Sequence, residues 1–229
     1  MKFIIVFDNE AKNRKLSKGW GISVFFPEIH LLMDTGESPV YLEENFDILG
    51  IKKEDIGYVF ITHEHWDHIG GIDAVKGDKR TVFVPKGFTD DTLEMLNAMD
   101  FNVKVISEPG EILPDIYSSG PLGDVIKEQN LIVETQNGLS IFTGCSHPGL
   151  NNILENSKKF GTLVFQVTGG FHLLDKNKQQ IEEVINTFKK YRVKKVAPMH
   201  CTGDLGKEMF KETYGDDYID LGVGSEGEV

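Results

Sequence analysis

The sequence predicts an α+β fold over residues 1–229, built as a four-layer αβ/βα sandwich in a single domain. Short apolar runs typical of strands dominate the first part of the chain, whereas strands alternate with amphipathic helices in the last third. No linker rich in Gly, Pro or Ser separates the two parts. Strand-rich stretches punctuated by helices fit two packed sheets with helices on their outer faces.

The expected strands are short apolar runs that end at turn residues. The run at 58–61 is continuously apolar, which is typical of a buried strand. Gln136-Asn137-Gly138 predicts a hairpin turn. The expected strands are 3–7, 20–26, 30–33, 58–61, 81–85, 103–106, 115–118, 130–135, 139–142, 162–167 and 193–198.

The expected helices have apolar residues spaced to lie on one face. In 89–99, for example, Leu93, Leu96 and Met99 share a face. The expected helices are 41–49, 69–75, 89–99, 151–160, 178–191 and 205–214.

The charge balance narrows the class of partner. The chain has 24 Lys and Arg against 36 Asp and Glu, a formal net charge of −12. Nucleic-acid affinity comes largely from basic side chains on phosphates, so we expect no nucleic-acid partner. A small anionic substrate is compatible with this charge, because bound divalent cations reverse the potential locally. We therefore expect a small-molecule substrate.

The chain also shows no sign of a membrane or secretory segment. The apolar run at the N-terminus stops at Asp8, too early for a signal peptide. No run approaches the ~18 apolar residues that a membrane span needs. We expect a cytoplasmic protein without a membrane partner, in which Cys145 and Cys201 form no disulfide.

Three of the seven histidines lie in one short segment, His63-Glu64-His65-Trp66-Asp67-His68. In extended backbone the side chains at i and i+2 point the same way, so His63 and His65 are placed to bind one metal ion together. Asp67 and His68 follow after the chain has begun to turn and point to a second position. Imidazole and carboxylate ligands suit zinc, iron and similar metals. Gly70-Gly71 then lets the backbone pass close to the site.

This segment resembles the signature of the metallo-β-lactamase superfamily. The matching residues are His63-x-His65-x-Asp67-His68 after an apolar strand, and Asp34-Thr35-Gly36 at the end of an earlier strand. The resemblance extends over essentially the whole chain. It implies the metallo-β-lactamase fold and a site for two divalent metal ions, zinc first, with iron or manganese as alternatives.

Three later loops resemble one branch of that superfamily. They are Thr143-Gly144-Cys145-Ser146-His147-Pro148-Gly149, Gly169-Gly170-Phe171-His172-Leu173 and His200-Cys201-Thr202-Gly203. The branch contains the archaeal dihydropterin ribofuranosylaminobenzene phosphate synthases of methanopterin biosynthesis, together with metal-dependent hydrolases of unassigned substrate.

The resemblance implies a set of metal ligands. The first metal takes His63 and His65, and the second takes Asp67, His68 and His200. The sequence departs from the superfamily at the remaining positions, because Cys145 stands where a bridging Asp is usual and no histidine lies between His68 and His147. His147 is therefore taken as the third ligand of the first metal. The predicted metal ligands are His63, His65, Asp67, His68, His147 and His200.

Four further residues have more than one interpretation. His172 either contacts the substrate as an acid or base, or is structural. Asp34 either holds a ligand histidine in one tautomer or begins the turn before Gly36, and both can hold. Cys145 either approaches the metals or lines the pocket, and Cys201 is grouped with it.

Three functions fit these residues. The first is hydrolysis of a small anionic ester, lactone or phosphodiester, with Asp67 and His172 as catalytic residues. The second is a synthase that joins a phosphoribosyl donor to a pterin-like acceptor. The third is non-hydrolytic, either a di-iron redox protein or a metal-stabilised binding protein. Ligand types alone do not separate the first two.

Overall fold

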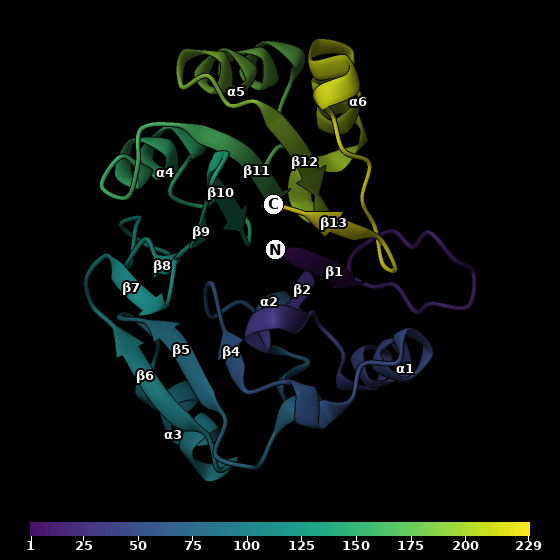
Figure 1. Ribbon diagram of the computed structural model, residues 1–229, viewed down its shortest axis with the longest axis vertical. Coiled ribbons are helices and arrows are strands. Elements are labelled where there is room, and N and C mark those ends of the chain that lie inside the picture. Colours follow the sequence, from purple (N-terminus) through teal and green to yellow (C-terminus); the bar gives the residue numbers. More distant parts are fainter. The chain divides into compact units, whose positions relative to one another are not determined.

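The computed structural model describes all residues, 1–229, and they form two compact units. The first unit contains Met1–Ser107 and Gly222–Glu228, and the second contains Glu108–Leu221 with Val229. Each unit holds one β-sheet and its own helices (Figure 1). None of the helices has the length and apolarity needed to cross a membrane. The expectation that 1–229 is a single domain stays a prediction.

The sheet of the first unit has seven strands, in the order β13-β1-β2-β3-β4-β5-β6. From β3 to β6 the neighbouring strands are parallel, whereas β13, β1, β2 and β3 pair in antiparallel fashion. The strands are β1 (Lys2–Phe7), β2 (Ser23–Phe26), β3 (Leu31–Met33), β4 (Tyr58–Phe60), β5 (Thr81–Pro85), β6 (Asn102–Ile106) and β13 (Glu226–Glu228). Because β3 and β4 are parallel neighbours, the loops that follow them leave from the same edge of the sheet.

Three α-helices belong to the first unit: α1 (Pro39–Leu49), α2 (Trp66–Ile69) and α3 (Asp90–Ala98). Three 3-10 helices span Pro27–Ile29, Lys53–Asp55 and Ile72–Val75. Side chains at the N-caps begin two of the α-helices, since Ser38 and Thr89 each accept a hydrogen bond from a backbone N–H of the first turn. The buried faces of the helices join the apolar core that includes Leu42, Phe46 and Leu96.

The single helix expected over 69–75 is wrong. The chain forms α2, then breaks at Gly70-Gly71, and then forms the 3-10 helix Ile72–Val75. A Cβ atom at Gly71 would overlap the carbonyl oxygen of Thr35, so the backbone passes the Asp34-Thr35 turn at a distance that only glycine allows. Asp67 and His68 consequently lie on α2, which is a single helical turn.

The sheet of the second unit has six strands, in the order β12-β11-β10-β9-β8-β7. They are β7 (Gly110–Leu113), β8 (Ile116–Ser118), β9 (Leu131–Thr135), β10 (Gly138–Thr143), β11 (Val164–Gly170) and β12 (Lys195–Met199). The last three are parallel, with Thr143 opposite Gly169 and Gly170 opposite Met199. The three His- and Cys-bearing loops therefore leave one edge of this sheet together.

The second unit has three α-helices, α4 (Leu150–Ser157), α5 (Lys178–Lys190) and α6 (Gly203–Tyr214), and 3-10 helices at His200–Thr202 and Gly215–Asp217. Phe171 anchors the loop after β11, because its ring packs against those of Phe188 and Phe210. The ring centroids lie 5.1 Å and 5.2 Å from that of Phe171. The three α-helices expected here are confirmed, with boundaries shifted by a few residues.

Two strands were not expected from the sequence, β7 and β13. His30 is also not within a strand. It ends the 3-10 helix Pro27–Ile29 with φ 54°, and its Nδ1 lies 2.8 Å from the carbonyl oxygen of Asp55.

Candidate metal centre

The first histidines of the candidate site follow β4 directly. His63 is buried, His65 is half-buried, and their ring centroids lie 4.7 Å apart. His65 has extended backbone, with φ −67° and ψ 144°. The structure thus brings these two rings together, as the i, i+2 spacing predicts.

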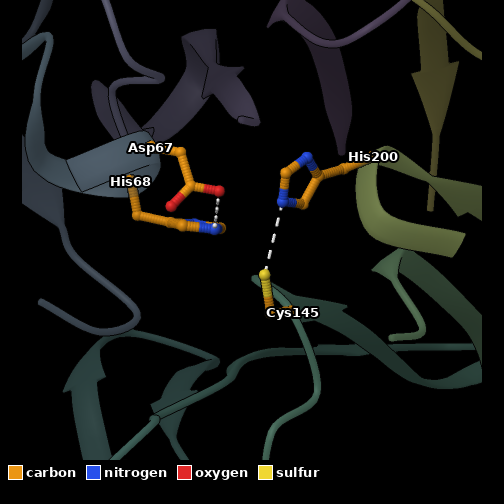
Figure 2. A group of neighbouring side chains, drawn as sticks. All are labelled: Asp67, His68, Cys145 and His200. Atoms are coloured by element: carbon orange, nitrogen blue, oxygen red, sulfur yellow. Dashed lines mark hydrogen bonds and ion pairs between the residues drawn. The ribbon is translucent and has the colours of Figure 1, made fainter. Parts of the chain in front are cut away.

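Asp67 and His68 are presented by α2. Both are buried, and the Asp67 carboxylate lies 3.5 Å from Nε2 of His68 (Figure 2). The ring of His68 lies 4.1 Å from that of His63, measured between centroids. Within the first unit, four of the six predicted ligands therefore form one cluster.

Asp34, at the end of β3, holds this cluster in place. One carboxylate oxygen accepts a 2.7 Å hydrogen bond from the Thr62 backbone N–H, and the other accepts one of 2.7 Å from the Thr62 hydroxyl. The second oxygen also lies 2.7 Å from Nδ1 of His68, which leaves Nε2 of that ring facing Asp67. Asp34 is fully buried with φ 53°, so it forms the turn and orients a predicted ligand at the same time.

The acidic surroundings change the protonation of His68. Burial acts most strongly and lowers its pKa, but the charges and hydrogen bonds of Asp34 and Asp67 together outweigh it and raise the pKa from 6.5 to about 10. The position of the ring is therefore one of strongly negative potential.

The other two residues of the segment face elsewhere. Glu64 accepts hydrogen bonds from the backbone N–H and hydroxyl of Thr89 and from the hydroxyl of Thr92, at the N-terminus of α3. This agrees with its omission from the predicted ligands. Trp66 is 60% exposed, so it does not fill the core.

In the second unit, the loop after β10 carries Cys145 and His147. Its backbone is organised by Glu128, which is fully buried. One carboxylate oxygen of Glu128 accepts from the N–H groups of Cys145 (3.2 Å) and Ser146 (2.9 Å), and the other accepts from that of His147 (2.8 Å). Ser146 has φ 65°, the left-handed conformation that lets three successive N–H groups converge. Sequence reasoning missed Glu128.

His200 and Cys201 lie on the 3-10 helix after β12. Nε2 of His200 is 3.3 Å from Sγ of Cys145 (Figure 2). The Cys201 thiol is directed at the carbonyl oxygen of Cys145, at 3.6 Å. Thr202 ties the helix to the neighbouring loop, because its hydroxyl donates to the Met199 carbonyl and accepts from the Phe171 N–H. Neither cysteine is part of a disulfide.

His172 follows the anchored Phe171 and is exposed, with φ 54°. Its ring lies 4.7 Å from that of His147, measured between centroids. A hydrogen bond with the Cys201 side chain raises the pKa of His172 against the effect of partial burial. Hydrogen bonding with Cys145, and with His172 as a smaller contribution, holds the pKa of Cys201 well below its usual value.

The predicted residues thus group within each unit. The first unit gathers His63, His65, Asp67, His68 and Asp34, and the second gathers Cys145, His147, His172, His200 and Cys201. Imidazole and carboxylate groups of this kind are ligands for Zn²⁺, Fe²⁺ or Mn²⁺. The ligand role of each residue stays a prediction.

Comparison with known proteins identifies the family. The sequence profile of the metallo-β-lactamase superfamily matches residues 27–149, which are 123 of the 229 residues. Two curated proteins of Methanocaldococcus jannaschii are similar over most of their length. One is 7,8-dihydropterin-6-methyl-4-(β-D-ribofuranosyl)-aminobenzene-5′-phosphate synthase, with 26% identity over 85% of this chain and 82% of that protein. The other is uncharacterised, with 27% identity over 87% of this chain and 90% of that protein.

A solved structure confirms the fold class. Tm1679, described as a metal-dependent hydrolase of the β-lactamase superfamily, superposes with a TM-score of 0.88 and is 28% identical, covering 100% of this chain and 99% of its own. The metallo-β-lactamase fold expected from the sequence is therefore confirmed, with two mixed sheets flanked by helices.

Proposed function

The chain belongs to the metallo-β-lactamase superfamily, and on that premise we propose that it is a hydrolase that uses two divalent metal ions. The substrate is a small anionic ester, lactone or phosphodiester. The ligands are those inferred from the sequence: His63, His65, Asp67, His68, His147 and His200.

The observation that carries this proposal is the environment of His68. Two carboxylates beside a buried imidazole create a negative potential that, without a metal, retains a proton up to a pH of about 10. A divalent cation bound beside the two carboxylates would be attracted by the same negative potential, and it carries twice the charge of a protonated imidazole. The hydrogen bond from Asp34 to Nδ1 leaves Nε2 to face a metal, which is the usual support of a ligand histidine. The donor set of the first unit therefore fits a metal of the zinc or iron class.

Two of the chain's own residues then act on the attacking water and on the leaving group. When bound, a divalent metal lowers the pKa of coordinated water to about 7 and polarises a substrate oxygen. Asp67 orients the attacking water, because its carboxylate is buried and fixed beside His68. His172 donates a proton to the leaving group, since it is exposed and a hydrogen bond with the Cys201 side chain raises its pKa above the ordinary value, which favours the protonated ring.

The relative from Methanocaldococcus jannaschii supports a second candidate. Its name states a synthase activity, and its similarity to this chain extends over 85% of the residues. The same donors would then bind a phosphoribosyl donor and direct it to a pterin-like acceptor, with release of pyrophosphate. Fold and family do not separate the two reactions, because one scaffold supports many chemistries.

Metal analysis tests the proposal first. Protein purified without added metal is analysed by mass spectrometry as wild type, His147→Ala and His200→Ala, with His30→Ala as the control because that histidine is exposed and outside the site. We expect at least two metal ions per wild-type chain, about one fewer in each site variant, and no change in His30→Ala. A metal content that is the same in all four proteins would refute the ligand assignment.

Activity assays then separate the two reactions. The wild type is screened against phosphodiesters, lactones and esters, and against a phosphoribosyl donor with a pterin acceptor. We expect hydrolysis that chelation abolishes and Zn²⁺, Mn²⁺ or Fe²⁺ restores. Release of pyrophosphate without hydrolysis would identify the synthase instead. Full activity of a verified metal-free protein would exclude both.

A further inference from the structure

Three side chains of residue types that bind metals meet in the second unit, and none of them is among the six proposed ligands, although Cys145 contacts one of these, His200. They are Cys145 after β10, His172 after β11 and Cys201 after β12. One ligand atom of each, a sulfur or a ring nitrogen, lies within 4.8 Å of the other two. Three adjacent parallel strands thus deliver two thiols and one imidazole to the same place.

The spacing fits a tetrahedral metal ion. Ligands at about 2.3 Å (sulfur) and about 2.0 Å (nitrogen) from zinc lie roughly 3.5–3.8 Å from one another in a tetrahedron. The three ligand atoms lie within 4.8 Å of one another, so each pair needs to approach by at most about 1.3 Å to reach these distances. Cys145 and Cys201 are 4% and 6% exposed, whereas His172 is exposed, so the imidazole is the solvent-facing member of the three.

The group is also held in place by the backbone. The N–H groups of Leu173 and Leu174 both donate to the carbonyl of Cys201, at 3.1 Å each, which fixes the His172 loop against the Cys201 helix. A Cβ atom at Gly170 would lie 2.7 Å from Sγ of Cys201, so only glycine leaves room for the thiol there. The three side chains are therefore positioned before any ion binds.

We propose that Cys145, His172 and Cys201 form a further binding site for a thiophilic divalent cation, next to the proposed ligand His200, with Zn²⁺ as the native candidate. Two sulfurs and one nitrogen suit zinc and its heavier analogue Cd²⁺, and leave one tetrahedral position open. On binding, each thiol releases its proton to solvent and the two thiolates balance the charge of the cation. No electron transfer is involved.

Occupancy of this site has a consequence that rests on the proposed function. An imidazole bound to an ion has no proton to donate from the coordinating nitrogen. A cation held by Cys145, His172 and Cys201 therefore prevents His172 from donating a proton to the leaving group. Binding at this site would inhibit the proposed hydrolase.

A Cd²⁺ titration tests the site without any measurement of activity. Metal-free, reduced protein is titrated with Cd²⁺, and thiolate-to-Cd²⁺ charge-transfer absorption is recorded in the ultraviolet. We expect a band that Zn²⁺ displaces. Cys201→Ser should lose about half of it or more, and His172→Ala should bind Cd²⁺ at least about 10-fold more weakly. His30→Ala is the matched control for the histidine variant and should behave as wild type.

The alternative is that Cys145 alone binds an ion through its contact with His200. In that case the band disappears in His200→Ala and is unchanged in Cys201→Ser and His172→Ala, which would overturn the proposal. Absence of any thiolate band in wild type would also overturn it.

If Cys201→Ser does not fold, as judged by circular dichroism, the exposed His172→Ala decides the question. Protection of both thiols from alkylation by Cd²⁺, read by mass spectrometry, gives an independent measurement. Because neither thiol is a proposed ligand of the hydrolase metals, failure here leaves the proposed function intact.

Discussion

The two units hold their histidines by different means. In the first unit a buried carboxylate, Asp34, contacts the ring of His68 itself, so the support is an interaction between charged side chains. In the second unit Glu128 and Thr202 contact backbone groups of the loops that carry Cys145, His147 and Phe171. The first arrangement depends on protonation of the supported group. The second depends only on hydrogen bonds to amides, which do not titrate.

This difference predicts different responses to pH. The pKa of His68 is raised from 6.5 to about 10, so its ion pair with Asp34 stabilises the metal-free fold fully below pH 6.5 and progressively less up to about pH 10. Support through backbone amides should stabilise the second unit equally across that range.

The largest effect is expected for Asp34→Asn. Removal of one partner of a buried ion pair costs about 3–5 kcal/mol, and we expect this loss in the unfolding free energy of the metal-free protein near pH 6.5. The difference from wild type should shrink as the pH approaches 10, because His68 then loses its proton in both proteins. Urea unfolding at several pH values measures it. Asp47→Asn, an exposed change on α1, is the control. A difference that does not vary with pH would contradict the ion pair.

An intermediate effect is expected for Glu128→Gln. The amide keeps one acceptor oxygen but turns an NH₂ group toward backbone N–H donors, so we expect a loss of about 2–3 kcal/mol in unfolding free energy. Glu134→Gln, at an exposed position on β9, should change stability by less than about 0.5 kcal/mol. The loss of unfolding free energy should be constant between pH 6.5 and 10. A loss that becomes smaller as the pH rises, as expected for Asp34→Asn, would contradict the claim that the support by Glu128 does not depend on pH.

The smallest effect is expected for Thr202→Val. This change removes the hydroxyl that links the Met199 carbonyl to the Phe171 N–H, and it should cost about 1–2 kcal/mol by urea unfolding. Thr202→Ser keeps the hydroxyl and should recover most of the loss. Equal losses in the two variants would assign the effect to the methyl group instead.

The same difference explains what the sequence could predict. His63, His65, Asp67 and His68 lie in one short segment, so their spacing alone indicates a metal site. The link from Asp34 to His68 could be proposed as one of two interpretations, since a ligand histidine needs such a partner. Glu128 could not be found, because its partners are backbone N–H groups and leave no pattern among side chains.

The fold was predictable to a similar degree. Amphipathic helices such as α5 carry their signal in Ile181, Ile185 and Phe188, which are all buried. By contrast, β13 consists of Glu226, Gly227 and Glu228 and has no apolar residue to mark it. It is a strand only because β1 offers a partner far away in the sequence, with Lys2 opposite Glu228. Pairing of this kind is a tertiary effect that local patterns do not contain.

The pairing of β13 with β1 also bears on how the chain is made. Residues 226–228 emerge from the ribosome only after the whole of 108–221 has been synthesised. Until then one side of β1 lacks the strand that pairs with it and is an open edge available to other chains. Translation therefore completes the first unit last, and a pause late in synthesis would prolong the period in which a nascent chain is most exposed to aggregation.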